Sequence, residues 1–177
     1  EIQFDYIRFP SDGPIERCRF RHKKDLSIFK SEPIIDFLRK ARESLEVPIS
    51  IDIYGITGWY HFGNRIGQDF EAIAEYADVL CPMVYPSHFG TTFYRNKASS
   101  EELPGLLVGE SIARARMLAG ENALVRPYLQ AFNLLSPTWG PDYIQKQIHA
   151  AEEKGTNGFS FWNAKGDYDM VVRAMKK

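Results

Sequence analysis

The first ten residues, EIQFDYIRFP, constrain the fold more than any other part of the chain. They predict a β-strand in which apolar Ile2 and Phe4 alternate with polar Gln3 and Asp5, before Pro10 stops it. A carboxylate at the end of a strand, opposite its apolar face, is unfavourable in a core. It is typical of a parallel α/β barrel, where catalytic groups sit at the C-terminal strand ends. Because the strand starts at residue 1, we also expect the chain to be part of a larger domain.

Strand-like and helical patterns alternate along the rest of the chain. After the first strand, further strands are predicted over residues 47–55, 78–86, 123–132 and 158–164. A helix capped by Ser31 carries an apolar stripe to Leu45, and further helices are predicted over 67–76, 106–118, 141–154 and 167–177. This order implies parallel strands joined by right-handed crossovers.

Two architectures satisfy that order, an open doubly wound sheet and a closed eight-stranded barrel. No glycine-rich phosphate loop follows any strand, and polar residues gather at the ends of several strands rather than at one switch point. We therefore predict an α/β fold: a partial (β/α) TIM barrel of about five βα units, corresponding to strands four to eight, in one domain over residues 1–177. Because such a partial barrel has two open strand edges, we expect it to form a homo-oligomer, to curl shut, or to be incomplete and poorly active alone.

Composition excludes several classes of partner. The net charge of −1 gives no electrostatic basis for binding nucleic acid, and no apolar run approaches the roughly 20 residues of a membrane span. Two cysteines form no disulfide framework and no Cys/His spacing resembles a zinc site, so neither a metal nor a cofactor is expected. One local basic cluster is interpreted as a solvated loop: Arg17, Arg19, Arg21, His22, Lys23 and Lys24.

Four strings carry a resemblance to a known family: IQFDYIRFPSDG, ISIDIYG, RIGQDFEAIAEYADVLCPMVYPSHFG and RPYLQAF. Along essentially its whole length the chain resembles the putative glycosyl hydrolase domain family (DUF4015), of which it would form the C-terminal part. The resemblance implies a TIM barrel related to barrel glycosidases and a carbohydrate substrate. It also implies an extracellular or cell-envelope location in bacteria.

Two carboxylates have the placement that a barrel glycosidase needs. Asp5 and Asp52 lie near the ends of strands expected to be neighbours, about 4.8 Å apart, which suits the roughly 5–5.5 Å carboxyl separation of retaining enzymes. We assign Asp5 as nucleophile and Asp52 as acid/base. The alternative is structural pairing with Arg8 or Arg126, which would depress the pKa of an aspartate, whereas a general acid needs a raised one.

Aromatic and polar side chains near the strand ends are candidates for contacting a sugar. Trp59 and Trp139, in loops, are candidate stacking platforms. In contrast, Asp78 starts a strand at the opposite face, where its role would be stability. The predicted substrate-binding residues are Arg8, Tyr54, Tyr85, His88, Gln130 and Trp162.

Three functions remain open at this point. The first is hydrolysis of a poly- or oligosaccharide by the two aspartates without a cofactor. The second is a non-catalytic carbohydrate-binding barrel of the bacterial cell envelope. The third, least favoured, is a divalent metal site at Asp5 and Asp52 serving a deacetylase-like hydrolase. Unpaired, neighbouring carboxyls would favour the first, and carboxyls neutralised by arginine would favour the second.

Overall fold

A computed structural model describes residues 1–19, 30–60, 66–90, 92–93 and 97–176, so most of the basic cluster, Arg21 to Lys24, lies outside the described residues. All strand pairs are parallel, and the sheet order is β1–β2–β3–β5–β6, with β4 also pairing with β3. The strands are β1 (Ile2–Phe4), β2 (Ile49–Tyr54), β3 (Val79–Met83), β4 (Leu124–Val125), β5 (Tyr128–Gln130) and β6 (Ser160–Trp162).

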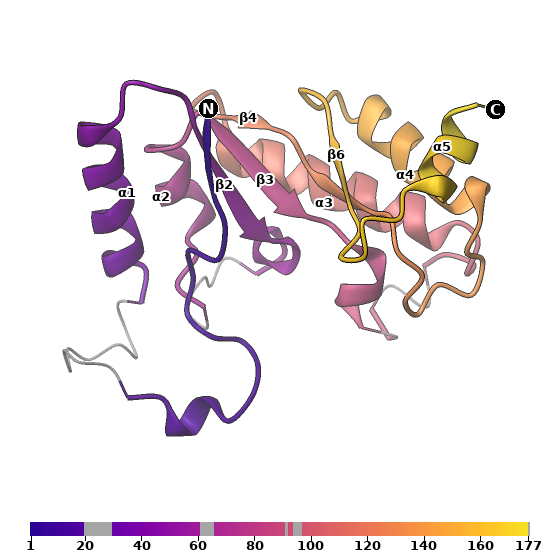
Figure 1. The fold of residues 1–177 in the computed structure, drawn as a ribbon, viewed down its shortest axis with the longest axis horizontal. Helices are drawn as coiled ribbons and strands as arrows, with labels where there is room; N and C mark the ends of the chain where they lie inside the picture. Colours follow the sequence, from indigo (N-terminus) through magenta and orange to yellow (C-terminus); the bar gives the residue numbers. More distant parts are fainter. Residues whose placement is uncertain (20–29, 61–65, 91, 94–96, 177) are drawn as a thin grey trace.

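Helices alternate with these strands and follow one another from α1 at one end of the molecule to α5 at the other (Figure 1). They are α1 (Glu32–Ser44), α2 (Phe70–Ala74), α3 (Leu103–Ala119), α4 (Pro141–Glu153) and α5 (Asp169–Met175). Short 3-10 helices η1 (Ile15–Arg17), η2 (Gly55–Gly58) and η4 (Pro86–Phe89) lie in the loops. The predicted α/β class with parallel βα units is confirmed.

Side-chain contacts across the sheet show that it is curved. Gln3 on β1 hydrogen-bonds Tyr128 on β5, although β2 and β3 separate these strands in the sheet. One layer below, the Glu1 carboxylate pairs with the Arg126 guanidinium. A flat sheet would hold these side chains roughly 15 Å apart, because neighbouring strands are about 4.8 Å apart. The sheet is therefore a half-barrel, as predicted, and the polar residues of β1, β2 and β5 meet on its concave side.

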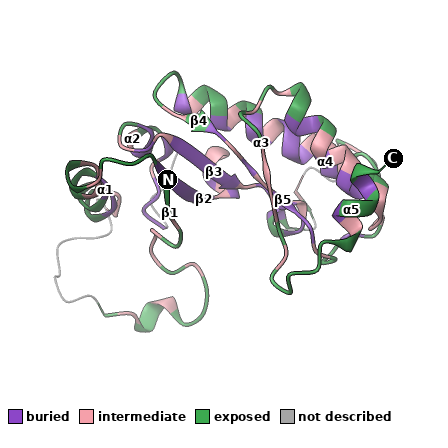
Figure 2. Cartoon of the chain, turned by 45° about the horizontal axis from the view of Figure 1, so that its top comes forward, coloured by how far each residue is buried: buried purple, intermediate pink, exposed green. Residues whose placement is uncertain are grey.

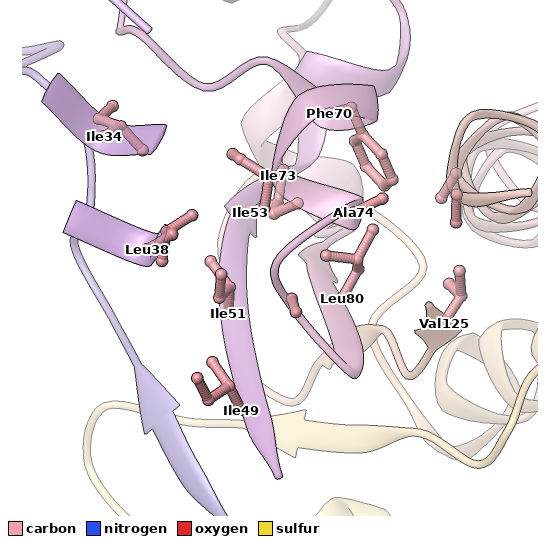
Figure 3. Packing of buried hydrophobic residues seen from close by; sticks show 13 residues of the cluster. Ile34, Leu38, Ile49, Ile51, Ile53, Phe70, Ile73, Ala74, Leu80 and Val125 are labelled. Atoms are coloured by element: carbon pink, nitrogen blue, oxygen red, sulfur yellow. The ribbon is translucent and has the colours of Figure 1, made fainter. Parts of the chain in front are cut away.

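The convex face of the sheet packs against the helices. Ile49, Ile51 and Ile53 of β2 are fully buried against Leu38 of α1 and Ile73 of α2 (Figure 3). The residues between them on β2 therefore face the concave side. Burial is concentrated on β2, β3 and the inward sides of the helices, while the outer surface of α1 is exposed (Figure 2). Burial of these leucine and isoleucine side chains fixes the orientation of β2, so the residues that alternate with them point away from this core.

All five predicted strands are shorter in the structure, and two of them also change course. The fourth, expected to be continuous over 123–132, is interrupted at Pro127, which has no N–H to donate within a sheet. The first ends at Phe4, and Tyr6 then adopts a left-handed conformation with φ of 59°. This turn sends the chain away from the sheet directly after Asp5. Asp5 is therefore the residue at which the chain leaves the C-terminal edge of the sheet.

Candidate active site

One pocket of about 530 Å³ lies at the C-terminal ends of the strands and gathers seven of the eight predicted site residues. It receives side chains from β2, β3, β5 and β6 and from the loops after β1 and β3. Its lining residues are Asp5, Tyr6, Arg8, Asp12, Asp52, Tyr54, Met83, Tyr85, His88, Tyr128 and Trp162. The strand ends named by the sequence thus converge on one concave site.

Asp52 is the more buried of the two predicted catalytic carboxylates. Its residue is 8% exposed, and its Oδ1 accepts a hydrogen bond of 2.5 Å from the Gln3 amide. The pKa of Asp52 is raised to about 6: burial raises it most, the Gln3 hydrogen bond lowers it, and the nearby Asp5 charge raises it by a smaller amount. A carboxyl with this pKa is partly protonated near neutral pH, as a general acid must be.

Asp5 follows β1, which pairs with β2, so the two carboxylates stand at the ends of adjacent strands. Asp5 Oδ1 accepts a hydrogen bond of 2.7 Å from the backbone N–H of Tyr6. Tyr6 owes this position to its positive φ, an unusual conformation for a residue with a side chain. The backbone turn therefore fixes the orientation of Asp5 through a neutral hydrogen-bond donor rather than through an ion pair.

Among the described residues, no ion pair joins either aspartate to an arginine. Arg126 pairs with Glu1 below the pocket. The Arg8 guanidinium lies 4.7 Å from the ring centre of Tyr6 and 5.3 Å from that of Tyr54, and it donates to Ser11 Oγ at 2.9 Å. The two arginines considered as structural partners of the aspartates thus bind other groups.

A buried glutamine that the sequence analysis missed supports the end of β2. The Gln68 side chain is fully buried, its Oε1 accepts from the Tyr54 N–H at 2.8 Å, and its Nε2 donates to the Asp52 carbonyl at 3.0 Å. The same Nε2 reaches the Ile7 carbonyl at 3.3 Å, beyond β1. One amide therefore ties together the two chain segments that carry the aspartates.

Aromatic side chains from the loop after β3 and from β6 line part of the pocket. Tyr85 is buried and meets the rings of His88 and Phe132 edge-on, at 5.1 and 5.4 Å between ring centres. Burial raises the pKa of the Tyr85 phenol and lowers the pKa of His88, so both are uncharged at neutral pH. Trp162, at the end of β6, is 48% exposed and offers an accessible ring at the rim. This combination suits a ligand with apolar ring faces.

Gln130 does not reach the pocket, although the sequence analysis expected it there. It is fully buried, accepts from the Ser87 N–H at 3.0 Å, and donates to the Phe132 carbonyl at 2.9 Å and Ser136 Oγ at 3.0 Å. The loop after β5 folds back over the end of the strand, and its residues 132 and 136 accept the hydrogen bonds of this amide. Gln130 therefore organises two loops, and Tyr128, two residues earlier, lines the pocket instead.

The two loop tryptophans are packing residues. Trp59 Nε1 donates to Ser111 Oγ on α3 at 2.9 Å, and its ring meets Phe89 and Phe93 edge-on. Trp139 packs against Tyr143 of α4, with 5.4 Å between ring centres. Neither lines the pocket at the strand ends. Both anchor loops to helices, a contact that their sequence neighbourhood does not reveal.

The pocket also contains residues that the sequence analysis did not assign to it: Tyr6, Asp12, Met83 and Tyr128. Strand parity was the usable signal for Tyr128, since it alternates with the core residue Leu129. No such signal existed for Tyr6 and Asp12, because they lie in the irregular loop after β1.

Two further features of the described residues bear on the alternatives. The part of the chain that the structure describes holds no group of three His, Cys, Asp or Glu side chains placed to share a metal ion. The metal alternative therefore gains no third protein ligand from these residues. Within the same described ranges, no helix is long and apolar enough to cross a membrane.

The fold and the pocket define a class: an α/β half-barrel with carboxylates and aromatic rings at the C-terminal ends of parallel strands, the arrangement of TIM-barrel enzymes. The chain belongs to the putative glycosyl hydrolase domain family (DUF4015), whose model matches residues 1–168. The resemblance drawn from the sequence is thereby confirmed. No curated protein matches the chain.

A solved glycoside hydrolase domain shares the half-barrel fold. The PgaB (BpsB) glycoside hydrolase domain from Bordetella bronchiseptica is 16% identical and superposes with a TM-score of 0.55 over 83% of this chain. The aligned part is 40% of the length of that domain, so this chain spans less than half of it. Bee venom hyaluronidase is 21% identical over 60% of this chain and 33% of its own, with a TM-score of 0.40, below the level of a shared fold.

Proposed function

We propose that this chain carries the catalytic pocket of a glycoside hydrolase that cleaves a poly- or oligosaccharide by a two-carboxylate mechanism. The observation that supports it best is the pair formed by Asp5 and Asp52. They stand at the ends of adjacent strands in one aromatic-lined pocket, without an arginine partner among the described residues. The more buried of them has its pKa raised to about 6. Membership of a glycosyl hydrolase domain family supports the same reaction class.

The two carboxyls take different roles because their surroundings differ. Protonated Asp52 donates its proton to the glycosidic oxygen as the bond to the anomeric carbon breaks. Asp5, as the ionised carboxylate, attacks that carbon and forms a glycosyl-enzyme ester. Asp52, now ionised, takes a proton from water, whose oxygen attacks the anomeric carbon and releases Asp5. The sugar keeps its anomeric configuration, and no cofactor enters the cycle.

The remaining pocket residues hold the sugar. The exposed face of Trp162 and the ring of Tyr54 offer stacking surfaces, and Arg8, Tyr85 and His88 offer hydrogen-bond donors to hydroxyl groups. The location outside the cytoplasm, in the bacterial envelope or secreted, rests on the family resemblance alone. We also propose that residues 1–177 form a single domain and that the chain forms a homo-oligomer through its open sheet edges.

The experiment incubates the full chain with a panel of polysaccharides and 4-nitrophenyl glycosides and measures released reducing ends and nitrophenol. Asp5→Asn and Asp52→Asn should each lower the rate at least about 100-fold. The matched control is Asp36→Asn, since Asp36 is exposed on α1 and pairs there with Arg39 and Lys40. Proton NMR of the first product would show retention of configuration.

A hydrolysis rate that neither aspartate variant changes would overturn the mechanism. Binding of a polysaccharide without hydrolysis, retained in both variants, would instead favour the carbohydrate-binding alternative. The exposed Trp162 ring is the observation in favour of that alternative, because stacking on a sugar requires no catalytic carboxyl.

A further inference from the structure

Gln3, on the edge strand β1, links three strands across the concave side of the sheet. Its Nε2 donates to Asp52 Oδ1 at 2.5 Å and to Tyr128 Oη at 3.0 Å, and its Oε1 lies 3.3 Å from the same phenol oxygen. These three side chains come from β1, β2 and β5, three strands of the half-barrel. Gln3 faces the concave side of the sheet by the same alternation that turns the partly buried Phe4 toward the ring of Phe37 on the opposite side.

We propose that Gln3 is a positioning residue for Asp52: its amide holds Oδ1, which leaves Oδ2 to carry the proton into the pocket, while Tyr128 fixes the plane of the amide. The inference rests on the proposed role of Asp52 as the acid. Gln3 itself touches no reacting atom. It acts by fixing which oxygen of the carboxyl is free and how readily that carboxyl ionises.

An amide is well suited to this position. A neutral donor stabilises the ionised carboxylate less than an arginine does, so it orients Asp52 without driving its pKa down to the range of an ion-paired aspartate. Among the described side chains, the Gln3 amide is the one that hydrogen-bonds the Asp52 carboxyl. Arg126, the cation that faces Asp52 from below, is held by Glu1.

The other groups that face Asp52 set the background for this contact. Asp5, beyond β1, adds negative charge. Burial raises the pKa of Cys81 and Tyr85, on and after β3, and of Tyr128 on β5, so all three are neutral near pH 7. The remaining charged or titratable groups of the pocket are Tyr6, Arg8 and Asp12 after β1, Tyr54 on β2 and His88 after β3.

The test is an NMR titration of the Asp52 side-chain carboxyl in the full chain, with ¹³C-labelled aspartate and Asp52→Asn for assignment. Gln3→Met keeps the side-chain length and removes both donors, so it should raise the pKa of Asp52 by about 0.5–1 unit, a 3- to 10-fold change in the ionisation constant. Tyr128→Phe keeps Gln3 and should give a smaller shift of the same sign. Gln145→Met is the matched control, because Gln145 bonds the Ala174 carbonyl between α4 and α5.

Kinetics separate positioning from a purely structural role. In Gln3→Met, the basic limb of the pH profile should move upward with the pKa of Asp52, and kcat should fall more than KM changes. An Asp52 pKa within about 0.2 units of the wild type in both Gln3→Met and Tyr128→Phe would overturn the inference. A shift in the titration without any hydrolysis would uphold the Gln3 contact and count against the proposed function alone.

Discussion

One aspartate lies beside each end of β2, in opposite surroundings: Asp78, the residue before β3, and Asp52, on β2 itself. Asp78 lies at the N-terminal end, where its Oδ2 accepts from the Arg42 guanidinium at 2.6 Å and from the Ile49 N–H at 2.7 Å. These bonds lower the pKa of Asp78 below its ordinary value against the opposing effect of burial. At the C-terminal end, Asp52 has one neutral donor and a raised pKa of about 6.

The difference shows how one strand separates stability from function. A carboxylate with a cation and a backbone donor stabilises the fold in its ionised form. A buried carboxylate without a cation destabilises the fold when ionised, so its retention needs another explanation. In parallel α/β barrels the face that bears the C-terminal strand ends is the catalytic one. Asp78 and Asp52 follow that division, although they are the same residue type beside the same strand.

The largest expected effect is on catalysis. Asp52→Asn should reduce kcat by about 10³-fold, because removal of a general acid typically lowers the rate 10²–10⁴-fold. Asp78→Asn should leave kcat within about three-fold of the wild type when both are assayed below their unfolding temperatures. A comparable loss of kcat in both variants would show that the two ends of β2 are not functionally distinct.

The next effect is on stability: removal of the buried Asp52 carboxyl should raise the free energy of unfolding at high pH. The folded-state pKa of Asp52 exceeds the unfolded value of 3.8, so ionisation destabilises the fold as pH rises from about 4, fully above about 7. Asp52→Asn should therefore raise the free energy of unfolding by up to about 3 kcal/mol at pH 8. Urea unfolding between pH 3.5 and 8 measures this difference, which should vanish below about pH 4. A difference that is independent of pH would contradict the raised pKa.

The sequence alone was sufficient for the fold and for most of the pocket. The alternation of Ile49, Ile51 and Ile53 with polar residues fixed which side of β2 faces the helices, and Asp52 followed from it. The same argument found Asp5 and Trp162 at strand ends. Periodicity works there because burial of one face determines the direction of every second side chain.

The alternation of side chains along a strand could not show which polar groups would be hydrogen-bonded by other parts of the protein. Gln130 and Tyr128 share a parity, yet the returning loop hydrogen-bonds Gln130 and leaves Tyr128 in the pocket. Gln68 lies outside any strand, and its contacts with Tyr54 and Ile7 join residues far apart in sequence. Long-range hydrogen bonds of this kind depend on the closed geometry of the loops, which no local pattern encodes.

A smaller effect is expected at the N-terminal end of β2. Asp78→Ala should lower the free energy of unfolding by about 1–2 kcal/mol at pH 7, since it removes a partly exposed ion pair and leaves the Ile49 N–H without its acceptor. Because the folded pKa of Asp78 is lowered, its stabilisation is present above about pH 4 and is lost as pH falls through the folded value. The pH dependence is thus opposite to that of Asp52. Equal free energies of unfolding of Asp78→Ala and the wild type at pH 7 would show that the bonds to Asp78 do not stabilise the fold.

The smallest effect tests whether the C-terminal rim binds sugar. Trp162 is about half exposed, so Trp162→Ala should change the free energy of unfolding by less than about 1 kcal/mol. Loss of a stacking surface should raise KM about 3- to 10-fold and leave kcat nearly unchanged, because stacking holds the ground state and the transition state alike. Met175→Ala is the control, since Met175 is an exposed apolar residue on α5, outside the pocket. If kcat fell with KM unchanged, Trp162 would act on the transition state, and the exposed ring would belong to the catalytic centre together with Asp5 and Asp52.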